Sequence, residues 1–282
     1  MIPAQFDYVR ATSVEQAVDL LSSNPEAKLL AGGHSLLPLM KLRLASPSML
    51  VDIGRLSELS GVRDGGDHLC IGALTRHRDL ETDPLLAQHL PLLAHVAGQV
   101  GDPQVRHRGT IGGSVAHGDP ASDLPAALLA LDALYVARGR SGERLIPASQ
   151  FHRGFLETAL DASEVLVEIR VPKRAAGRWS FQKFNRRAQD WAIVGVAAIR
   201  DGSVSVSMSM SVSVSVSLVN MASSPVRASA VESAVEAGAS AEEASSHADE
   251  GTDPSSDLNA SADFRRHLAR VLVRRALEEV GL

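Results

Sequence analysis

The sequence predicts an α+β fold in more than one domain, and three observations indicate it. Up to about residue 171, strand-length apolar runs and helix-spaced apolar positions alternate without a regular β-α-β repeat, which disfavours a doubly wound sheet. After the basic, glycine-containing turn at 172–177, strand patterns predominate. The length of 282 residues also exceeds that of most single domains. We therefore expect a boundary between residues 173 and 174.

The N-terminal segment predicts a helix and two strands. A helix is expected to begin at residues 12–13, because Thr-x-x-Glu and Ser-x-x-Gln pairs there have the spacing of a capping box. Apolar residues then recur at helical spacing, at Val14, Ala17, Val18 and Leu21. Short apolar runs predict buried strands at 28–30 and 49–53, and the segment 36–44 predicts a helix interrupted near Pro38.

The middle of the sequence continues this irregular mixture of elements. The expected order is a strand at 68–74, a helix at 85–100 divided by Pro91, an irregular stretch at 101–120, a helix at 122–132, and strands at 134–137 and 165–171.

The third part is richer in strands. Strands are expected at 178–184 and 191–199, followed by a hairpin turn at Asp201-Gly202. In 203–218, serine alternates with Val, Met or Leu, which gives a strand one apolar and one hydroxyl face. Sixteen residues at ~3.3 Å each would span roughly 50 Å, so we expect a shorter ordered strand with the surplus bulged or folded back. We interpret this segment as scaffold.

The C-terminal segment is predicted to hold a partly flexible acidic connection at 237–257 and a long helix at 259–280. The apolar side of this helix comprises Phe264, Leu268, Val271, Leu272 and Leu277. Its basic surface comprises Arg265, Arg266, Arg270, Arg274 and Arg275. For these arginines a solvated helix face is a better interpretation than a partner-binding patch.

Composition excludes several classes of protein. The net charge of −5 gives no reason to expect a nucleic-acid partner. No apolar run approaches the ~20 residues of a membrane span, and residues 1–10 show no signal-peptide pattern. Cys70 is the only cysteine, which excludes an internal disulfide and any cluster held by several thiolates of this chain. We expect a cytoplasmic protein.

Common catalytic and nucleotide-binding motifs are also absent. The sequence contains no Gly-x-Gly-x-x-Gly, no Walker loop, no His-Glu-x-x-His and no Gly-x-Ser-x-Gly. We therefore predict neither a catalytic side chain nor a metal site in this chain, and interpret the ten histidines as structural or surface residues.

Two glycine-pair motifs are the most informative feature: Ala-Gly-Gly-His-Ser at 31–35 and Thr-Ile-Gly-Gly-Ser at 110–114. A glycine pair permits positive φ and can turn backbone N–H groups toward an anion, although a single pair is usually an ordinary turn. Two such motifs fit two walls that close on one anionic ligand. Arg106 and Arg108 suit a diphosphate or simply anchor the loop, and helix capping is the favoured role of Asp119 and Asp123.

The two motifs with their flanks, 31–38 and 101–114, closely resemble the FAD-binding (medium) subunit of the molybdenum hydroxylase family, of the carbon monoxide dehydrogenase and xanthine dehydrogenase type. The segments 151–155, 164–166, 183–187, 190–192 and 224–228 agree in the same order. The resemblance implies an FAD-binding domain of the PCMH type at 1–173, with subdomains at about 1–55 and 56–173. It further implies a smaller α+β C-terminal domain at 174–282, with an antiparallel sheet and helices.

The resemblance also implies a set of FAD-binding residues. The first motif would grip the diphosphate and its neighbourhood through Leu30, Ala31, Gly32, Gly33, His34, Ser35 and Leu36. The second would do so through Thr110, Ile111, Gly112, Gly113 and Ser114. Positions that touch the flavin in the family correspond to Val100, Asp123, Leu166 and Lys183. Trp191 corresponds to a side chain near the flavin ring.

The function implied is electron transfer within a heteromeric enzyme. The chain would bind FAD noncovalently, take electrons from [2Fe–2S] clusters on a small subunit and pass them to an external acceptor. The molybdenum cofactor would lie on a large subunit, and a dimer of heterotrimers is expected. The alternatives are a self-sufficient flavin oxidase and an FAD-free assembly subunit. Two features depart from the family: the unbroken alternation at 203–218, and the single Cys70, which cannot hold the extra iron–sulfur cluster of some relatives.

Overall fold

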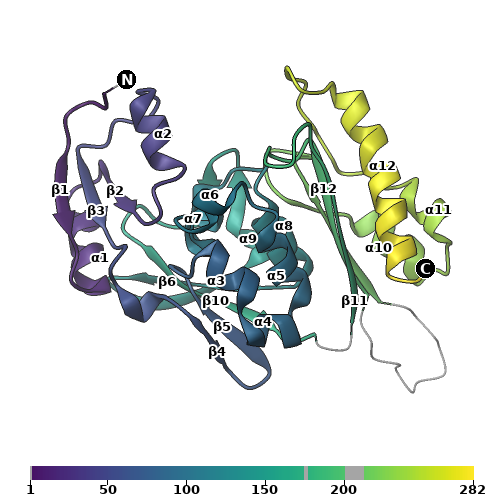
Figure 1. The fold of residues 1–282 in the computed structure, drawn as a ribbon, viewed down its shortest axis with the longest axis horizontal. Helices are drawn as coiled ribbons and strands as arrows, with labels where there is room; N and C mark the ends of the chain where they lie inside the picture. The colour runs from purple at the N-terminus through teal and green to yellow at the C-terminus, as the bar shows by residue number, and fades with distance from the viewer. Residues whose placement is uncertain (1, 175–176, 201–212) are drawn as a thin grey trace.

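The computed structural model describes residues 2–174, 177–200 and 213–282, and within them it places three larger sheets in a row (Figure 1). The first sheet is parallel, in the order β1-β3-β2. Its elements are β1 (Asp7–Arg10), α1 (Val14–Ser23), β2 (Ala27–Leu30), α2 (Leu36–Lys41) and β3 (Met49–Asp52). Because all three strands are parallel, their carboxyl ends lie at one edge.

Local sequence signals determine the helices of this first part of the fold. Ser13 caps α1 by accepting a hydrogen bond from the N–H of Gln16, so the predicted helix start is confirmed. Pro38 lies in the first turn of α2, where a backbone N–H has no intrahelical partner. The helix therefore runs through Pro38, and the predicted interruption is wrong.

The second sheet is antiparallel, in the order β4-β5-β10-β6-β7. Its strands are β4 (Val62–Asp64), β5 (His68–Gly72), β6 (Leu134–Gly139), β7 (Gly142–Pro147) and β10 (Val165–Pro172), and the 3-10 helix η1 (Ser57–Leu59) precedes them. The helices in this part are α3 (His77–Thr82), α4 (Pro84–His89), α5 (Pro91–Gly98), α6 (Pro103–Arg106), α7 (Ile111–His117), α8 (Asp123–Ala130) and α9 (Ala148–Phe151). A small hairpin, β8 (His152–Gly154) and β9 (Glu157–Thr158), follows α9.

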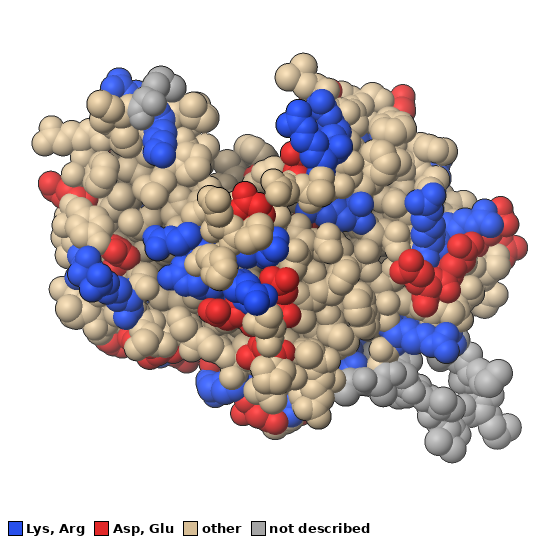
Figure 2. All heavy atoms as spheres, in the orientation of Figure 1, with Lys and Arg blue, Asp and Glu red and all other residues tan. Residues whose placement is uncertain are grey.

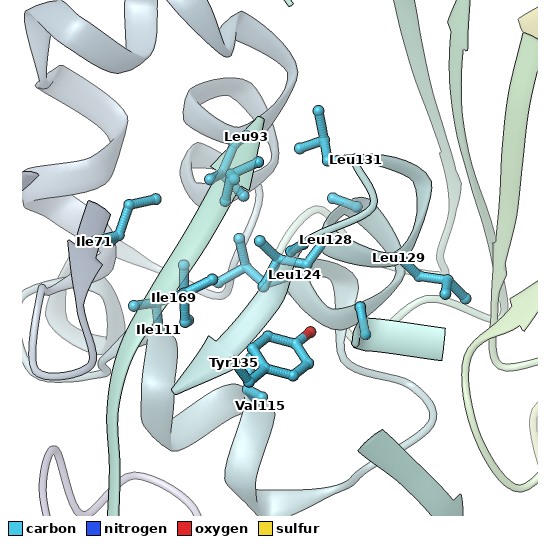
Figure 3. Packing of buried hydrophobic residues seen from close by; sticks show 14 of the residues in the cluster. Ile71, Leu93, Ile111, Val115, Leu124, Leu128, Leu129, Leu131, Tyr135 and Ile169 are labelled. Carbon is cyan, nitrogen blue, oxygen red and sulfur yellow. The ribbon is translucent and has the colours of Figure 1, made fainter. Parts of the chain in front are cut away.

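The largest core lies between this sheet and its helices. Figure 3 shows Ile111 and Val115 of α7 with Ile169 of β10 and Tyr135 of β6. The Tyr135 ring meets the edge of Phe151, with 4.5 Å between ring centroids. Aliphatic residues fill most of the remaining space, as the low aromatic content of the sequence predicts.

The third sheet is antiparallel, in the order β11-β12-β13-β14. Its elements are β11 (Arg178–Phe184), β12 (Val194–Arg200), β13 (Val214–Val219), β14 (Val226–Arg227), α10 (Ser229–Glu236), α11 (Ala241–Ser245) and α12 (Ala262–Glu279). In β13, Val214, Val216 and Leu218 belong to a core shared with α12. The hydroxyl face of β13 is buried as well. On this face, Ser217 Oγ donates to Ala126 O at 2.5 Å. The hairpin turn predicted at 201–202, and residues 203–212 of the alternating segment, lie outside the described residues.

Three sequence predictions are corrected in this structure. The stretch 101–120 contains two helices, α6 and α7. The acidic segment 237–257 contains α11, which Ser240 and Glu243 close with a complete capping box. Arg265 is only 1% exposed and is not part of a basic surface.

No helix in the described part of the chain is long and apolar enough to cross a membrane.

Candidate functional site

A pocket of about 320 Å³ lies at the carboxyl edge of the parallel sheet. Its lining comprises Arg10, Leu30, Ala31, Gly32, Leu37, Asp52, Gly54, Arg55, Arg76 and Arg108. Four guanidinium groups and one carboxylate give this lining a net positive charge. Ligands of open α/β sheets bind outside the carboxyl ends of parallel strands, and arginine suits phosphate and carboxylate groups. The pocket is therefore suited to an anion.

The first glycine motif forms one wall of this pocket. Gly33 has a φ of +78°, a conformation that favours glycine, and its carbonyl accepts from the N–H of Leu37 in α2. In the described part of the chain, the N–H groups of residues 32–35 donate to no other protein group. These N–H groups therefore have no partner in the described part of the chain, and of their residues Gly32 lines the pocket.

The second glycine motif is built differently from the sequence prediction. Gly112 and Gly113 lie in the first turn of α7, which Thr110 caps by accepting from the N–H of Gly113. The N–H groups of Ile111, Gly112 and Ser114 donate to carbonyls of Thr75, Ala73 and Thr110, respectively. An open set of inward N–H groups is thus the wrong description here. Gly112 serves close packing, because a Cβ on it would lie 2.6 Å from the Cβ of Ala73.

The backbone just before the second motif touches the first motif directly. A Cβ on Gly32 would lie 2.3 Å from the carbonyl oxygen of Arg108. Arg76 fastens the same segment, since its Nη1 donates to the carbonyls of His107 and Arg108 at 3.0 Å each. The first motif and the segment just before the second motif are therefore two adjoining walls of the pocket, whereas residues 110–114 do not line it.

For Arg106 and Arg108 the sequence left two roles open, which are binding a diphosphate and anchoring the loop. The two residues differ in the structure. Arg106 anchors the loop, because Nη1 donates to the carbonyls of Val100 and Gly101 and Nε pairs with Glu81 at 3.2 Å. Arg108 instead lines the pocket. Sequence reasoning missed Arg10, Arg55 and Arg76 as pocket residues. The only available signal was the position of Arg55 just after the strand predicted at 49–53, since no strand was predicted to end at Arg10.

A buried ion pair links α8 to the C-terminal sheet. Lys183 Nζ lies 2.7 Å from Asp123 Oδ2 and also donates to the carbonyl of Gln99. Burial raises the pKa of Asp123, and the charge of Lys183 opposes that shift. Among the described residues, Asp123 Oδ1 has no partner. The capping role preferred for Asp123 is wrong, whereas Asp119 does accept from the N–H of Ala121 in the preceding turn.

Of the predicted site residues, only Leu30, Ala31 and Gly32 line the pocket. Val100 is adjacent to Gln99, which places it beside the ion pair of Lys183. Leu166 is buried on β10 in the largest core. Trp191 precedes β12 and is 56% exposed, so its ring is free to contact a ligand or a partner. Figure 2 shows the surface hollowed between the lobe that carries α2 and the lobe that carries α12.

Fold and site together define a protein with a cationic pocket, suited to an anionic ligand, at the edge of a parallel sheet. No group of three or more His, Cys, Asp or Glu residues that could bind a metal occurs in the parts of the chain described above.

Comparison with known proteins gives the family. Residues 4–174 match the family model described as the FAD binding domain in molybdopterin dehydrogenase, and residues 179–280 match the CO dehydrogenase flavoprotein C-terminal domain. The chain is 43% identical to the carbon monoxide dehydrogenase medium chain of Hydrogenophaga pseudoflava, over 98% of this chain and 97% of that one. It is 34% identical to the glyceraldehyde dehydrogenase medium chain of Sulfolobus acidocaldarius over the full length of both.

Solved structures agree with these matches. Carbon monoxide dehydrogenase from Hydrogenophaga pseudoflava gives a TM-score of 0.94 at 43% identity, covering 99% of this chain and 98% of that one. Quinoline 2-oxidoreductase from Pseudomonas putida 86 gives a TM-score of 0.90 at 32% identity, covering 99% and 98%. The chain belongs to the family of FAD-binding subunits of molybdopterin dehydrogenases.

Proposed function

We propose that this chain is the FAD-binding electron-transfer subunit of a heteromeric molybdenum-containing hydroxylase or dehydrogenase. It receives electrons from [2Fe–2S] clusters of a small subunit and delivers them to an external acceptor. The observation that carries the proposal is the match to medium chains over the whole length of the sequence, combined with a cationic pocket lined by the first glycine motif and by Arg108, just before the second. The molybdenum cofactor belongs to a large subunit, and the assembly is a dimer of heterotrimers.

The residues present fit FAD. Four arginines line the pocket, which suits the negative charge of a diphosphate, and the free N–H groups at 32–35 add donors. Gly32 leaves no space for a side chain where the two walls meet. FAD, when bound, supplies the redox chemistry, while the protein contributes binding, orientation and electrostatics.

The proposed site has the two groups of contacts that the resemblance implies, one with the diphosphate and one with the flavin. Diphosphate contacts come from residues 30–36 and from residues 110–114, with side-chain hydroxyls rather than N–H groups acting in the second motif. Flavin contacts come from Val100, Asp123, Leu166, Lys183 and Trp191. The unpartnered Oδ1 of Asp123 supports this assignment, because a buried carboxylate oxygen ordinarily accepts a hydrogen bond.

The proposed domains are 1–173, with subdomains at about 1–55 and 56–173, and 174–282. Each of these three parts holds one of the larger sheets. We place the assembly in the cytoplasm. The relatives are named for substrates as different as carbon monoxide and glyceraldehyde, so the substrate is a property of the large subunit.

The test is purification of the chain with its small and large subunits, followed by flavin analysis. The complex should show flavin absorption and release one FAD per copy of this chain after denaturation. Gly33→Val should abolish flavin retention, because Gly33 has positive φ and its Cβ would lie 2.9 Å from Leu37 Cδ1. Gly61→Val is the matched control, since Gly61 also has positive φ but open space around it. A flavin-free wild-type complex would contradict the proposal.

A further inference from the structure

His77 lies buried directly behind the second glycine motif, with 2% of its surface exposed. Its backbone N–H donates to the carbonyl of Gly109 at 3.1 Å. Its ring packs on the same residue, because a Cβ on Gly109 would lie 2.7 Å from Nε2. Gly109 in turn lies against the first motif, as a Cβ on Gly32 would be 3.0 Å from Gly109 Cα. A continuous series of contacts therefore runs from the first motif to His77.

The imidazole of His77 reaches the last residue of the second motif. Nε2 lies 3.3 Å from Ser114 Oγ, and Ser114 is partly exposed. The N–H groups of residues 111–114 are already used within the protein. The hydroxyl of Ser114 is therefore the polar group of this residue that remains to meet a ligand.

The protonation of His77 follows from its surroundings. Burial, together with the charges of His34 and Arg106, lowers the pKa of His77 to about 4, so the ring is neutral at pH 7. A neutral ring carries one proton, and in the described structure Nδ1 has no hydrogen-bond partner. An orphaned buried N–H is rarer in proteins than an unused acceptor. This places the proton on Nε2, where it donates to Ser114 Oγ.

We infer that His77 is a positioning residue for the anionic part of the cofactor: by donating to Ser114 Oγ it turns the Ser114 O–H outward, toward a phosphate oxygen of FAD. With the proton on Nδ1, the Ser114 hydroxyl would donate inward and present lone pairs to the phosphate. The inference rests on the proposed function, because it takes FAD as the ligand and Ser114 as one of its contacts.

The test measures flavin affinity in the intact complex after removal of its flavin. FAD and riboflavin, which has no phosphate, are titrated against wild type, His77→Phe, Ser114→Ala and the double variant. We expect each single variant to weaken FAD binding about tenfold, as for the loss of one hydrogen bond to a charged group. The double variant should be no weaker than Ser114→Ala alone, and riboflavin affinity should stay unchanged.

A second pair of variants separates hydrogen bonding from packing. His77→Gln can place an amide N–H near the position of Nε2 and should restore most of the FAD affinity. His77→Asn places its amide near Nδ1 and should not. The inference is overturned if His77→Phe binds FAD as wild type does, if the two single effects add, or if riboflavin binding falls equally. Failure of the wild-type complex to bind FAD would instead refute the proposed function.

Discussion

Replacing Gly32 by alanine tests whether the two walls of the site must touch. An added Cβ would lie 2.3 Å from the carbonyl oxygen of Arg108, and contacts under 3.0 Å are essentially never seen. The two backbones must therefore separate by at least about 0.7 Å, the difference between these distances. The Arg108 carbonyl is not free to turn aside, because it also accepts a hydrogen bond from Arg76 Nη1.

Overpacking of this kind costs about 1–3 kcal/mol. The flavin-free protein can relax by letting the walls part, whereas bound FAD requires them in place, so the cost appears mainly in affinity. Gly32→Ala should therefore weaken FAD binding by roughly 5- to 150-fold, with a small change in melting temperature. Fluorescence titration of the flavin-stripped complex measures the change. Gly154→Ala is the control, because the nearest atom to its Cβ would be 3.5 Å away. Wild-type affinity in Gly32→Ala would refute the contact between the walls.

Three further predictions concern stability, each read from urea denaturation of the chain. Lys183→Met should destabilise by about 3–5 kcal/mol, because it leaves the Asp123 carboxylate buried without its partner, and adding Asp123→Leu should recover much of the loss. His77 should contribute a loss of roughly 3 kcal/mol in the free energy of unfolding as pH falls from 6.5 to 4, because its ring takes up a proton there in the unfolded chain and much less in the folded one; His77→Gln should lack this contribution while keeping that of the other titrating groups, and identical pH profiles of the two proteins would contradict the buried neutral ring. Arg265→Met should cost roughly 2 kcal/mol, because Nη2 pairs with Asp257 at 2.8 Å, and an unchanged unfolding midpoint would show that the pair contributes nothing.

Local signals made most of the fold predictable. The cap at Ser13, the break at Pro91 and the positive φ of Gly33 are each decided within a few residues, and the structure has all three. The segment 237–257 was mispredicted because its acidic composition outweighed the Ser240-x-x-Glu243 capping box. Arg265 was mispredicted because helical periodicity gives a face but cannot tell how far a neighbouring sheet covers it.

The candidate site depends more on contacts that are distant in sequence. Gly33 and Gly112 occur in similar glycine-pair motifs of the sequence. Gly112, however, has to be glycine because its backbone packs closely against Ala73, almost forty positions earlier in the sequence. Arg76 and His77 carry no motif of their own. They become part of the site only because α3 begins beside Gly109. No local pattern contains that information.

The burial of helix α8 determines whether the two domains of the chain can unfold separately. All eight of its residues are buried, with one side in the largest core and Ala126 against Ala192 and Val219 of the C-terminal part. Ala197 and Ile199 of β12 also belong to the core of the preceding part. Truncation after residue 173 would expose this helix to water, so the boundary along the sequence is not a boundary of cooperative unfolding. The chain should melt in one transition, and the half that holds the glycine motifs should not be stable alone.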